Sequence, residues 1–189
     1  CRNMLPFDKQ ERSRYGISAA AARLYLLRWG QGRSFKTAEG VIFLTHFVKQ
    51  AVSKTIGLQE GHAVVIPHGA SEHVRMQPRP QRALDALSVE QPLRILYVST
   101  VDIYKHQWHV AEAVAALRVE GLPVQLDLIG PAQGPSLLRL RRTMARLDPE
   151  GAFLRYRGAV PFEQLRSTYE QSDIFVFASS CENMPNILL

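Results

Sequence analysis

The chain has 189 residues, of which 46% are hydrophobic and 21% charged, a balance that suits a globular protein and excludes a collagen-like or disordered chain. Its formal charge of +6 is uneven, because residues 1–92 hold 13 Lys and Arg against 7 Asp and Glu, and residues 93–189 hold 10 of each. A basic first half is expected to face nucleic acid, anionic lipid or a phosphorylated small molecule.

The compartment can be inferred from what the sequence lacks. No apolar run approaches the roughly 18 residues of a membrane span, and the first residues do not follow the plan of a signal peptide. The only cysteines, Cys1 and Cys181, have neither metal-ligand nor disulfide spacing. We therefore expect a cytoplasmic protein.

The first half of the chain predicts a strand–helix–strand unit. Residues 17–29 form a helical pattern that we expect to end near Gly30 and Gly32. Residues 41–44 and 63–66 are short apolar runs typical of strands, and Thr45 is placed to cap a helix over residues 46–55. The apolar face of the first helix is expected to comprise Ile17, Ala20, Ala21, Leu24 and Leu27. Two parallel strands joined by a crossover helix are the expected result.

A change of composition divides the chain. Residues 70–92 are rich in proline and polar residues, with a short helical stretch at 82–87, and predict a linker between lobes spanning 1–69 and 93–189. The second lobe is expected to have strands at 93–99, 124–129, 153–156 and 174–177 and amphipathic helices at 106–120, 135–147 and 161–171. Four strands alternating with three helices predict an open α/β sheet. The expected fold class is α/β, with two Rossmann-like lobes.

Ligands of open α/β sheets bind beyond the carboxyl ends of the strands. The turn after residue 99 holds Lys105 where a helix begins, and a cation there suits an anionic ligand such as a diphosphate. A solvated turn lysine is the alternative. The turn after residue 177 holds Glu182, ahead of a helix expected to start near Pro185. A capping acid is the alternative for Glu182.

Several other kinds of site are absent from the sequence. It contains no GxGxxG, GxxxxGK[ST], GxSxG or DxD motif. The histidines at 62, 68, 106 and 109 lack paired acids, so we expect surface or capping roles and no metal site. The arginines at 139, 142 and 146 form a cationic helix face that we expect to be solvated, without a nucleic-acid partner.

Two C-terminal segments carry a family resemblance. Residues 157–160, Arg-Gly-Ala-Val, followed by residues 172–189 resemble the donor-binding half of the retaining family 4 glycosyltransferases, which have the GT-B fold. Residues 98–106 and 63–69 also resemble that family, so the likeness extends over nearly the whole chain. It implies a GT-B arrangement with both lobes incomplete, an internal fragment that is expected to be inactive alone.

The resemblance also implies roles for individual residues. Lys105 would contact the diphosphate of a nucleotide-sugar, and Glu182 would be the first of the family's two glutamates and contact the transferred sugar. Backbone near Val160 would meet the base, and Asn186 and Ile187 would offer amide groups to phosphate. A departing diphosphate stabilised by a lysine and a helix dipole needs no metal or other cofactor, and none is expected.

The sequence departs from the family pattern at two points. Ser99 and Thr100 stand where the family usually has an arginine, and Ser99 would belong to the donor-binding residues. The second glutamate would fall one residue beyond Leu189. One diphosphate contact and one ribose contact are therefore not supplied by the family's usual residues.

The function implied is transfer of a hexose from a nucleotide-sugar to a glycan or lipid-linked acceptor, in bacterial cell-surface polysaccharide synthesis. Residues 1–54 hold 10 Lys and Arg against 3 Asp and Glu, which favours peripheral contact with an anionic membrane on its cytoplasmic side. The alternatives are another GT-B enzyme, such as a sugar-nucleotide epimerase, or a basic module that binds nucleic acid or anionic lipid.

Overall fold

The computed structural model describes residues 4–59, 61–69, 80–132 and 134–188, which fall into two compact units. The first comprises Cys1–Ser71 with Ser180–Leu189, and the second Glu72–Ser179. The first unit's main segment ends inside the expected linker, of which residues 70–79 lie outside the described part. Residues 180–189, expected in the second lobe, group with the first unit.

Two hydrogen bonds account for this grouping of the C-terminal segment. Thr45 Oγ1 donates to Asn183 Oδ1 at 3.3 Å. The backbone N–H of His68 donates to Met184 Sδ at 3.4 Å. The segment is thus tied to the loops that follow the first unit's two strands.

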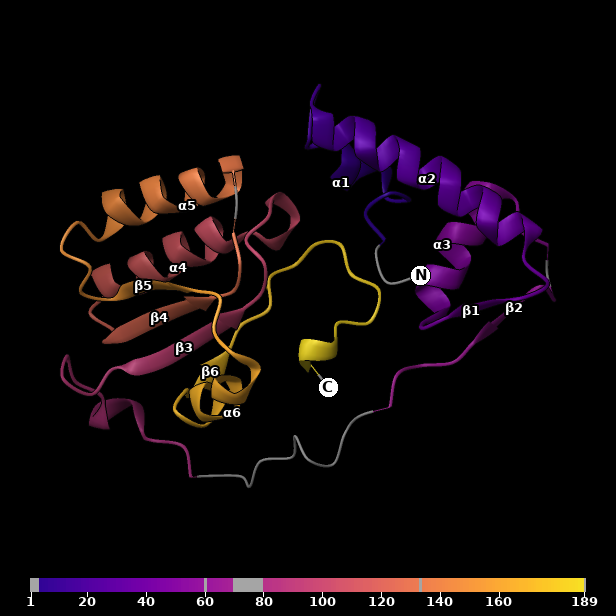
Figure 1. Cartoon of the computed structure of the whole chain (residues 1–189). Coiled ribbons are helices and arrows are strands. Elements are labelled where there is room, and N and C mark those ends of the chain that lie inside the picture. Colours follow the sequence, from indigo (N-terminus) through magenta and orange to yellow (C-terminus); the bar gives the residue numbers. More distant parts are fainter. Residues whose placement is uncertain (1–3, 60, 70–79, 133, 189) are drawn as a thin grey trace. The chain divides into compact units, whose positions relative to one another are not determined.

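The first unit contains the predicted strand–helix–strand arrangement (Figure 1). Its elements are α1 (Lys9–Ser13), α2 (Ala19–Thr37), β1 (Val41–Phe43), α3 (His46–Ile56) and β2 (Ala63–Val65). β1 and β2 pair in parallel, and Thr45 Oγ1 accepts a hydrogen bond from the N–H of Val48. The expected crossover and the cap by Thr45 are confirmed.

The helix expected at residues 17–29 has different bounds. Ser18 is its N-cap, and α2 runs through Gly30 and Gly32 to Thr37. A Cβ on Gly32 would lie 3.3 Å from Ile56 Cγ2, so this glycine permits close packing of α2 on α3. The predicted stop at Gly30 and Gly32 was wrong, because tertiary packing outweighs the low helix propensity of glycine.

The buried face of α2 is also narrower at its start than predicted. Ala21 and Leu24 are buried, but Ile17 and Ala20 are exposed. Near the other end of the helix, Phe35 lies 5.9 Å from the ring of Phe7 and 6.0 Å from that of Phe43, measured between centroids. The aromatic contacts of Phe35 anchor the part of the helix that the sequence pattern did not predict.

The second unit follows the predicted alternation of strands and helices. Its elements are η2 (Leu84–Ala86), β3 (Leu93–Val98), η3 (Ile103–Lys105), α4 (Gln107–Val119), β4 (Val124–Ile129), α5 (Gly134–Leu147), β5 (Leu154–Gly158), α6 (Phe162–Glu170) and β6 (Ile174–Phe175). The helical stretch expected at 82–87 is only the 3₁₀ turn η2. The four strands and three helices of the predicted open sheet are confirmed.

The sheet of the second unit is parallel throughout, in the order β5-β4-β3-β6. α4 and α5 cover one face, and α6 lies on the other (Figure 1). The chain adds β4 and β5 on one side of β3 and then returns to place β6 on the other side. This reversal creates a topological switch point between β3 and β6, the position where ligands bind in such sheets.

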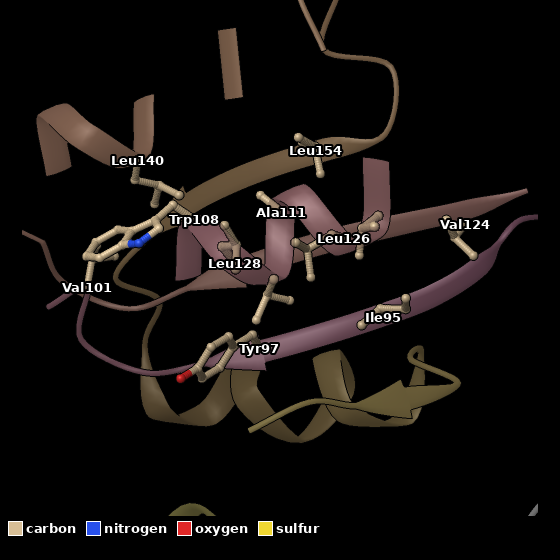
Figure 2. Close-up of a cluster of buried hydrophobic side chains, with 12 residues drawn as sticks. Ile95, Tyr97, Val101, Trp108, Ala111, Val124, Leu126, Leu128, Leu140 and Leu154 are labelled. Atoms are coloured by element: carbon tan, nitrogen blue, oxygen red, sulfur yellow. The ribbon is translucent and has the colours of Figure 1, made fainter. Parts of the chain in front are cut away.

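The core of the second unit lies between α4, α5 and the strands (Figure 2). Trp108 is 2% exposed, and Leu126 and Leu140 are fully buried. Val110 and Val114 of α4 are buried, as expected for an amphipathic helix, whereas Ala113 is exposed. Burial of each large apolar side chain contributes about 1.5–3 kcal/mol, so this cluster holds the helices firmly against the sheet.

A buried carboxylate joins α5 to β5. Asp148 accepts hydrogen bonds from the N–H groups of Ala152, Phe153 and Leu154 at 2.7–2.8 Å. Burial opposes its charge, but these donors outweigh that effect and lower the pKa of Asp148.

None of the described helices is long and apolar enough to cross a membrane.

Candidate functional site

The loop that follows β3 is held at the carboxyl edge of the sheet by backbone contacts. The N–H of Ser99 donates to the carbonyl of Ile129 at 2.8 Å, and that of Val101 donates to the carbonyl of Pro131 at 2.9 Å. Buried Gln107 donates from Nε2 to the carbonyl of Thr100 at 2.9 Å. These bonds fix the loop against the turn after β4 and against the start of α4.

Lys105 ends this loop and is only 8% exposed. Its Nζ lies 4.9 Å from the ring centroid of Tyr104 and 5.2 Å from that of Phe177. Its carbonyl accepts a hydrogen bond from the hydroxyl of Tyr97. The alternative of a solvated turn lysine does not hold, because aromatic faces hold the ammonium group.

The partners of Lys105 place it at the topological switch point. Phe177 follows β6, and Lys105 follows β3, so their contact joins the two loops that flank the switch. Ser179 Oγ donates to the carbonyl of Tyr104 at 3.4 Å and adds a second contact between the same loops. Lys105 therefore lies where an open α/β sheet binds its ligand.

Gly130 shapes the same edge, and sequence reasoning missed it. Its φ is +140°, and a Cβ there would lie 2.1 Å from the carbonyl oxygen of Ser99, so no larger residue fits. Its N–H donates to the carbonyl of Gly158 at 2.8 Å, and its carbonyl accepts from the hydroxyl of Tyr156 at 2.9 Å. Burial raises the pKa of Tyr156. The sequence signal that could have identified Gly130 was a glycine directly after a buried strand.

Gln107 is the second residue that sequence reasoning missed. It is 2% exposed and supports the loop that carries Lys105. Its Oε1 is buried without a hydrogen-bond partner in the described part of the chain. A polar residue at the first position of a helix resembles a surface residue in sequence, so only the fold reveals that Gln107 is buried.

The other predicted donor-site residues divide between the two units. Ser99 shares the loop with Lys105, and half-buried Val160 lies in the turn after β5, at the same carboxyl edge. Half-buried Glu182 belongs to the first unit, as do Asn186 and Ile187.

The helix expected near Pro185 is a three-residue 3₁₀ turn, η4 (Asn186–Leu188). Its N–H at Leu188 bonds to the carbonyl of Pro185, three residues back. The turn begins where the helix was expected to begin, and within the described residues it is a 3₁₀ turn. The capping alternative for Glu182 stays a prediction.

The other side-chain clusters considered from sequence give no metal centre. No group of three or more His, Cys, Asp and Glu side chains is close enough to hold an ion among the described residues.

The arginines of the predicted cationic row lie on α5. Arg139 lies over the ring of Trp108, with 4.1 Å from its Cζ to the ring centroid, and Arg146 pairs with Glu112 at 3.0 Å. Two of the three arginines in the cationic row thus have partners within the unit.

Comparison with solved structures finds the same fold in glycosyltransferases. HepE from Anabaena, in complex with UDP and glucose, matches with a TM-score of 0.68 and 16% identity over 93% of this chain and 46% of its own. WaaG, involved in lipopolysaccharide biosynthesis, matches with a TM-score of 0.70 and 12% identity over 96% and 50%. TarM from S. aureus matches with a TM-score of 0.58 and 12% identity over 90% and 31%.

These matches establish the architecture. The neighbours are glycosyltransferases of the two-lobed GT-B fold, and the mixed α/β fold with parallel sheets expected from sequence is confirmed. The chain spans half or less of the length of these three proteins. No protein-family model and no curated protein matches the sequence.

Proposed function

We propose that the chain is the central part of a retaining glycosyltransferase that transfers a hexose from a UDP-sugar to a glycan or lipid-linked acceptor. The observation that carries the proposal is Lys105, buried between aromatic rings at the switch point between β3 and β6. Solved structures of the same fold contain UDP, and one contains UDP-glucose. A role in bacterial cell-surface polysaccharide synthesis is part of this proposal.

Lys105 would act on the leaving group. Cleavage of the sugar–phosphate bond leaves a nucleoside diphosphate with growing negative charge, and a fixed ammonium group stabilises that charge as it develops. α4 begins two residues after Lys105, and the free N–H groups and dipole of a helix start favour anions. Because these groups already supply positive charge, we propose that the reaction needs no metal or other cofactor.

The remaining assignments come from the family resemblance. Backbone around Val160 and Ser99 would line the nucleotide, Asn186 and Ile187 would offer amides to phosphate, and Glu182 would hydrogen-bond the transferred sugar. Glu182 would therefore matter for turnover rather than for binding of the nucleotide alone.

A titration of the full-length protein with UDP, UDP-glucose and UMP tests this proposal. UDP and UDP-glucose should bind at least about tenfold more tightly than UMP, because charge-assisted contacts to the second phosphate are worth about 1.5–3 kcal/mol. Glu182→Gln should reduce sugar transfer while leaving UDP affinity unchanged. Equal affinity for UMP and UDP would contradict a diphosphate site.

A second part of the proposal is peripheral contact of the first unit with an anionic membrane on its cytoplasmic side. Tyr25, Leu26 and Trp29 on α2 are 58–71% exposed. Tyr25 and Trp29 line a groove of about 650 Å³ whose other lining residues include Arg28, Arg33 and Lys36. Exposed aromatic and basic side chains on one helix suit the boundary of an anionic bilayer.

Two of the basic residues among residues 1–54 have partners within the unit. Arg12 is 5% exposed, donates to the carbonyl of Pro6 and lies under the ring of Tyr25. Arg14 pairs with Glu11 at 2.9 Å. Arg33 and Lys36 of the groove are exposed, and we propose that they contact lipid.

Vesicle sedimentation tests the membrane contact. The full-length protein should sediment with vesicles containing anionic lipid, less so as salt rises. Arg33→Glu with Lys36→Glu should abolish sedimentation, and the matched control Arg141→Glu with Arg142→Glu on α5 should not. Unchanged sedimentation of the α2 variant would remove this surface as the contact.

A further inference from the structure

A pair of histidines lies at the beginning of α4, directly after Lys105. The Nδ1 atoms of His106 and His109 are 3.2 Å apart. Their ring centroids are 5.3 Å apart, and the angle between the ring planes is 25°. The centroid separation exceeds the nitrogen separation by about the two ring radii, so the rings meet edge to edge through Nδ1.

This geometry fixes where protons reside. Two Nδ1 atoms that face each other share one proton, because one must donate and the other must accept. The Nε2 atom of each ring points away from the shared bond. When the pair takes up one further proton, both Nε2 atoms become donors and the pair carries a positive charge.

The backbone conformation marks His106 as well. Its φ is +57°, and no other non-glycine residue in the described part of the chain has a positive φ. That conformation is strained for an L-residue. Strain of this kind is commonly found at functional sites, and here it turns the chain between Lys105 and α4.

The charges around the pair are of both signs. Lys105 and Asp102 belong to the preceding loop, and Glu112 is one turn along α4 from His109. From α5, Arg139 lies over the ring of Trp108, which contacts His109 at 5.8 Å between centroids, and Arg146 binds Glu112. Three of these groups are cations and two are anions, and Glu112 is paired with Arg146, so the net charge around the pair is positive and favours an added anion.

We propose that the His106–His109 pair is a proton-dependent contact for the diphosphate of the donor. The inference rests on the proposed function, because it takes a nucleotide-sugar at the Lys105 loop as its ligand. Histidine is the side chain whose change of charge ordinarily falls between pH 5 and pH 8. Donor binding would then tighten as the pH falls and the pair takes up the further proton.

Calorimetric titration of the full-length protein with UDP-glucose between pH 6 and pH 8 tests this inference. UDP-glucose is the right probe because each of its phosphates carries one ester bond and one anhydride bond, so its only acidic group is fully ionised and its charge is constant over this range. Affinity should be about tenfold higher at pH 6 than at pH 8, since a hydrogen bond to a charged group contributes about 1.5 kcal/mol or more.

Two variants isolate the pair. His109→Gln and His106→Asn, the latter chosen because asparagine tolerates a positive φ, should flatten the pH dependence to within about twofold. The matched control His46→Gln, on α3, should keep the full dependence. If both pair variants keep it, the inference is wrong although the donor site stands.

A measurement on the unmodified protein does not depend on whether the variants fold. In NMR spectra, the ring resonances of His106 and His109 should titrate together, with one midpoint, and shift on addition of UDP-glucose. Independent titration of the two rings would overturn the shared proton. Absence of UDP-glucose binding at every pH would instead contradict the proposed function, and the inference with it.

Discussion

The two units contain parallel sheets that are covered to different extents. In the second unit, helices lie on both faces of a four-stranded sheet, and Leu96 and Leu126 are fully buried. In the first unit, Val41 and Phe43 of β1 are buried, whereas Ile42 is 57% and Val64 52% exposed. Within the described residues, the first unit therefore buries one face of its sheet and the second unit buries both.

This difference decides how each unit is held together. The second unit is stabilised by its own apolar core and by hydrogen bonds at the edge of the sheet, and these bonds also shape the Lys105 loop. The first unit depends on a long helix anchored by aromatic contacts. Single substitutions at the sheet edge should therefore cost more than comparable changes in α2.

Gly130→Ala should have the largest effect on stability. A Cβ at this position would lie 2.1 Å from the Ser99 carbonyl oxygen, so β3 and β4 must separate, at a cost above about 4 kcal/mol. Urea unfolding followed by fluorescence of Trp108, with Trp29 replaced by Phe, measures the second unit alone. Gly121→Ala is the matched control, since its φ is +90° but nothing lies within 4 Å.

Asp148→Ala should destabilise the second unit by about 3 kcal/mol, because three backbone N–H groups lose their acceptor. The folded-state pKa of Asp148 is below the ordinary 3.8, so its contribution is complete above that value and is lost as the pH falls through the lowered folded pKa. The difference between parent and variant should shrink in acid. A difference independent of pH would show that the charge plays no part.

Gly30→Ala should have a small and opposite effect. Gly30 lies inside α2 with nothing within 4 Å of its added Cβ, so alanine should stabilise the first unit by about 0.5–1 kcal/mol through helix propensity. Urea unfolding followed by fluorescence of Trp29 in a Trp108→Phe background measures this. Destabilisation would mean that the helix ends before Gly30, as the sequence pattern suggested.

The sequence predicted the second unit better than the first, for a physical reason. Runs such as residues 124–129 lie between helices whose periodicity is equally clear, so local pattern and fold agree. The end of α2 depends on contacts of Phe35 and Gly32 that are distant in sequence. Burial of Lys105 and Gln107 could not be predicted either, because both are polar residues next to a helix start.

The grouping of residues 180–189 with the first unit could not be predicted from the sequence either. The family resemblance assigned Glu182 to the second lobe, but contacts of Asn183 with Thr45 and of Met184 with His68 tie the segment to the first unit. A short strand followed by polar residues gives no local signal of such partners. The role of Glu182 remains a prediction from the resemblance.

Calorimetric titration of Lys105→Met with UDP-glucose tests the central claim most directly. Methionine keeps an unbranched apolar chain between Tyr104 and Phe177 but removes the charge, so the fold should persist while the diphosphate loses its cation. A Kd raised about 10-fold to 150-fold is predicted, the equivalent of about 1.5–3 kcal/mol. Equal affinity of variant and parent would contradict the claim that Lys105 at the β3–β6 switch binds the donor.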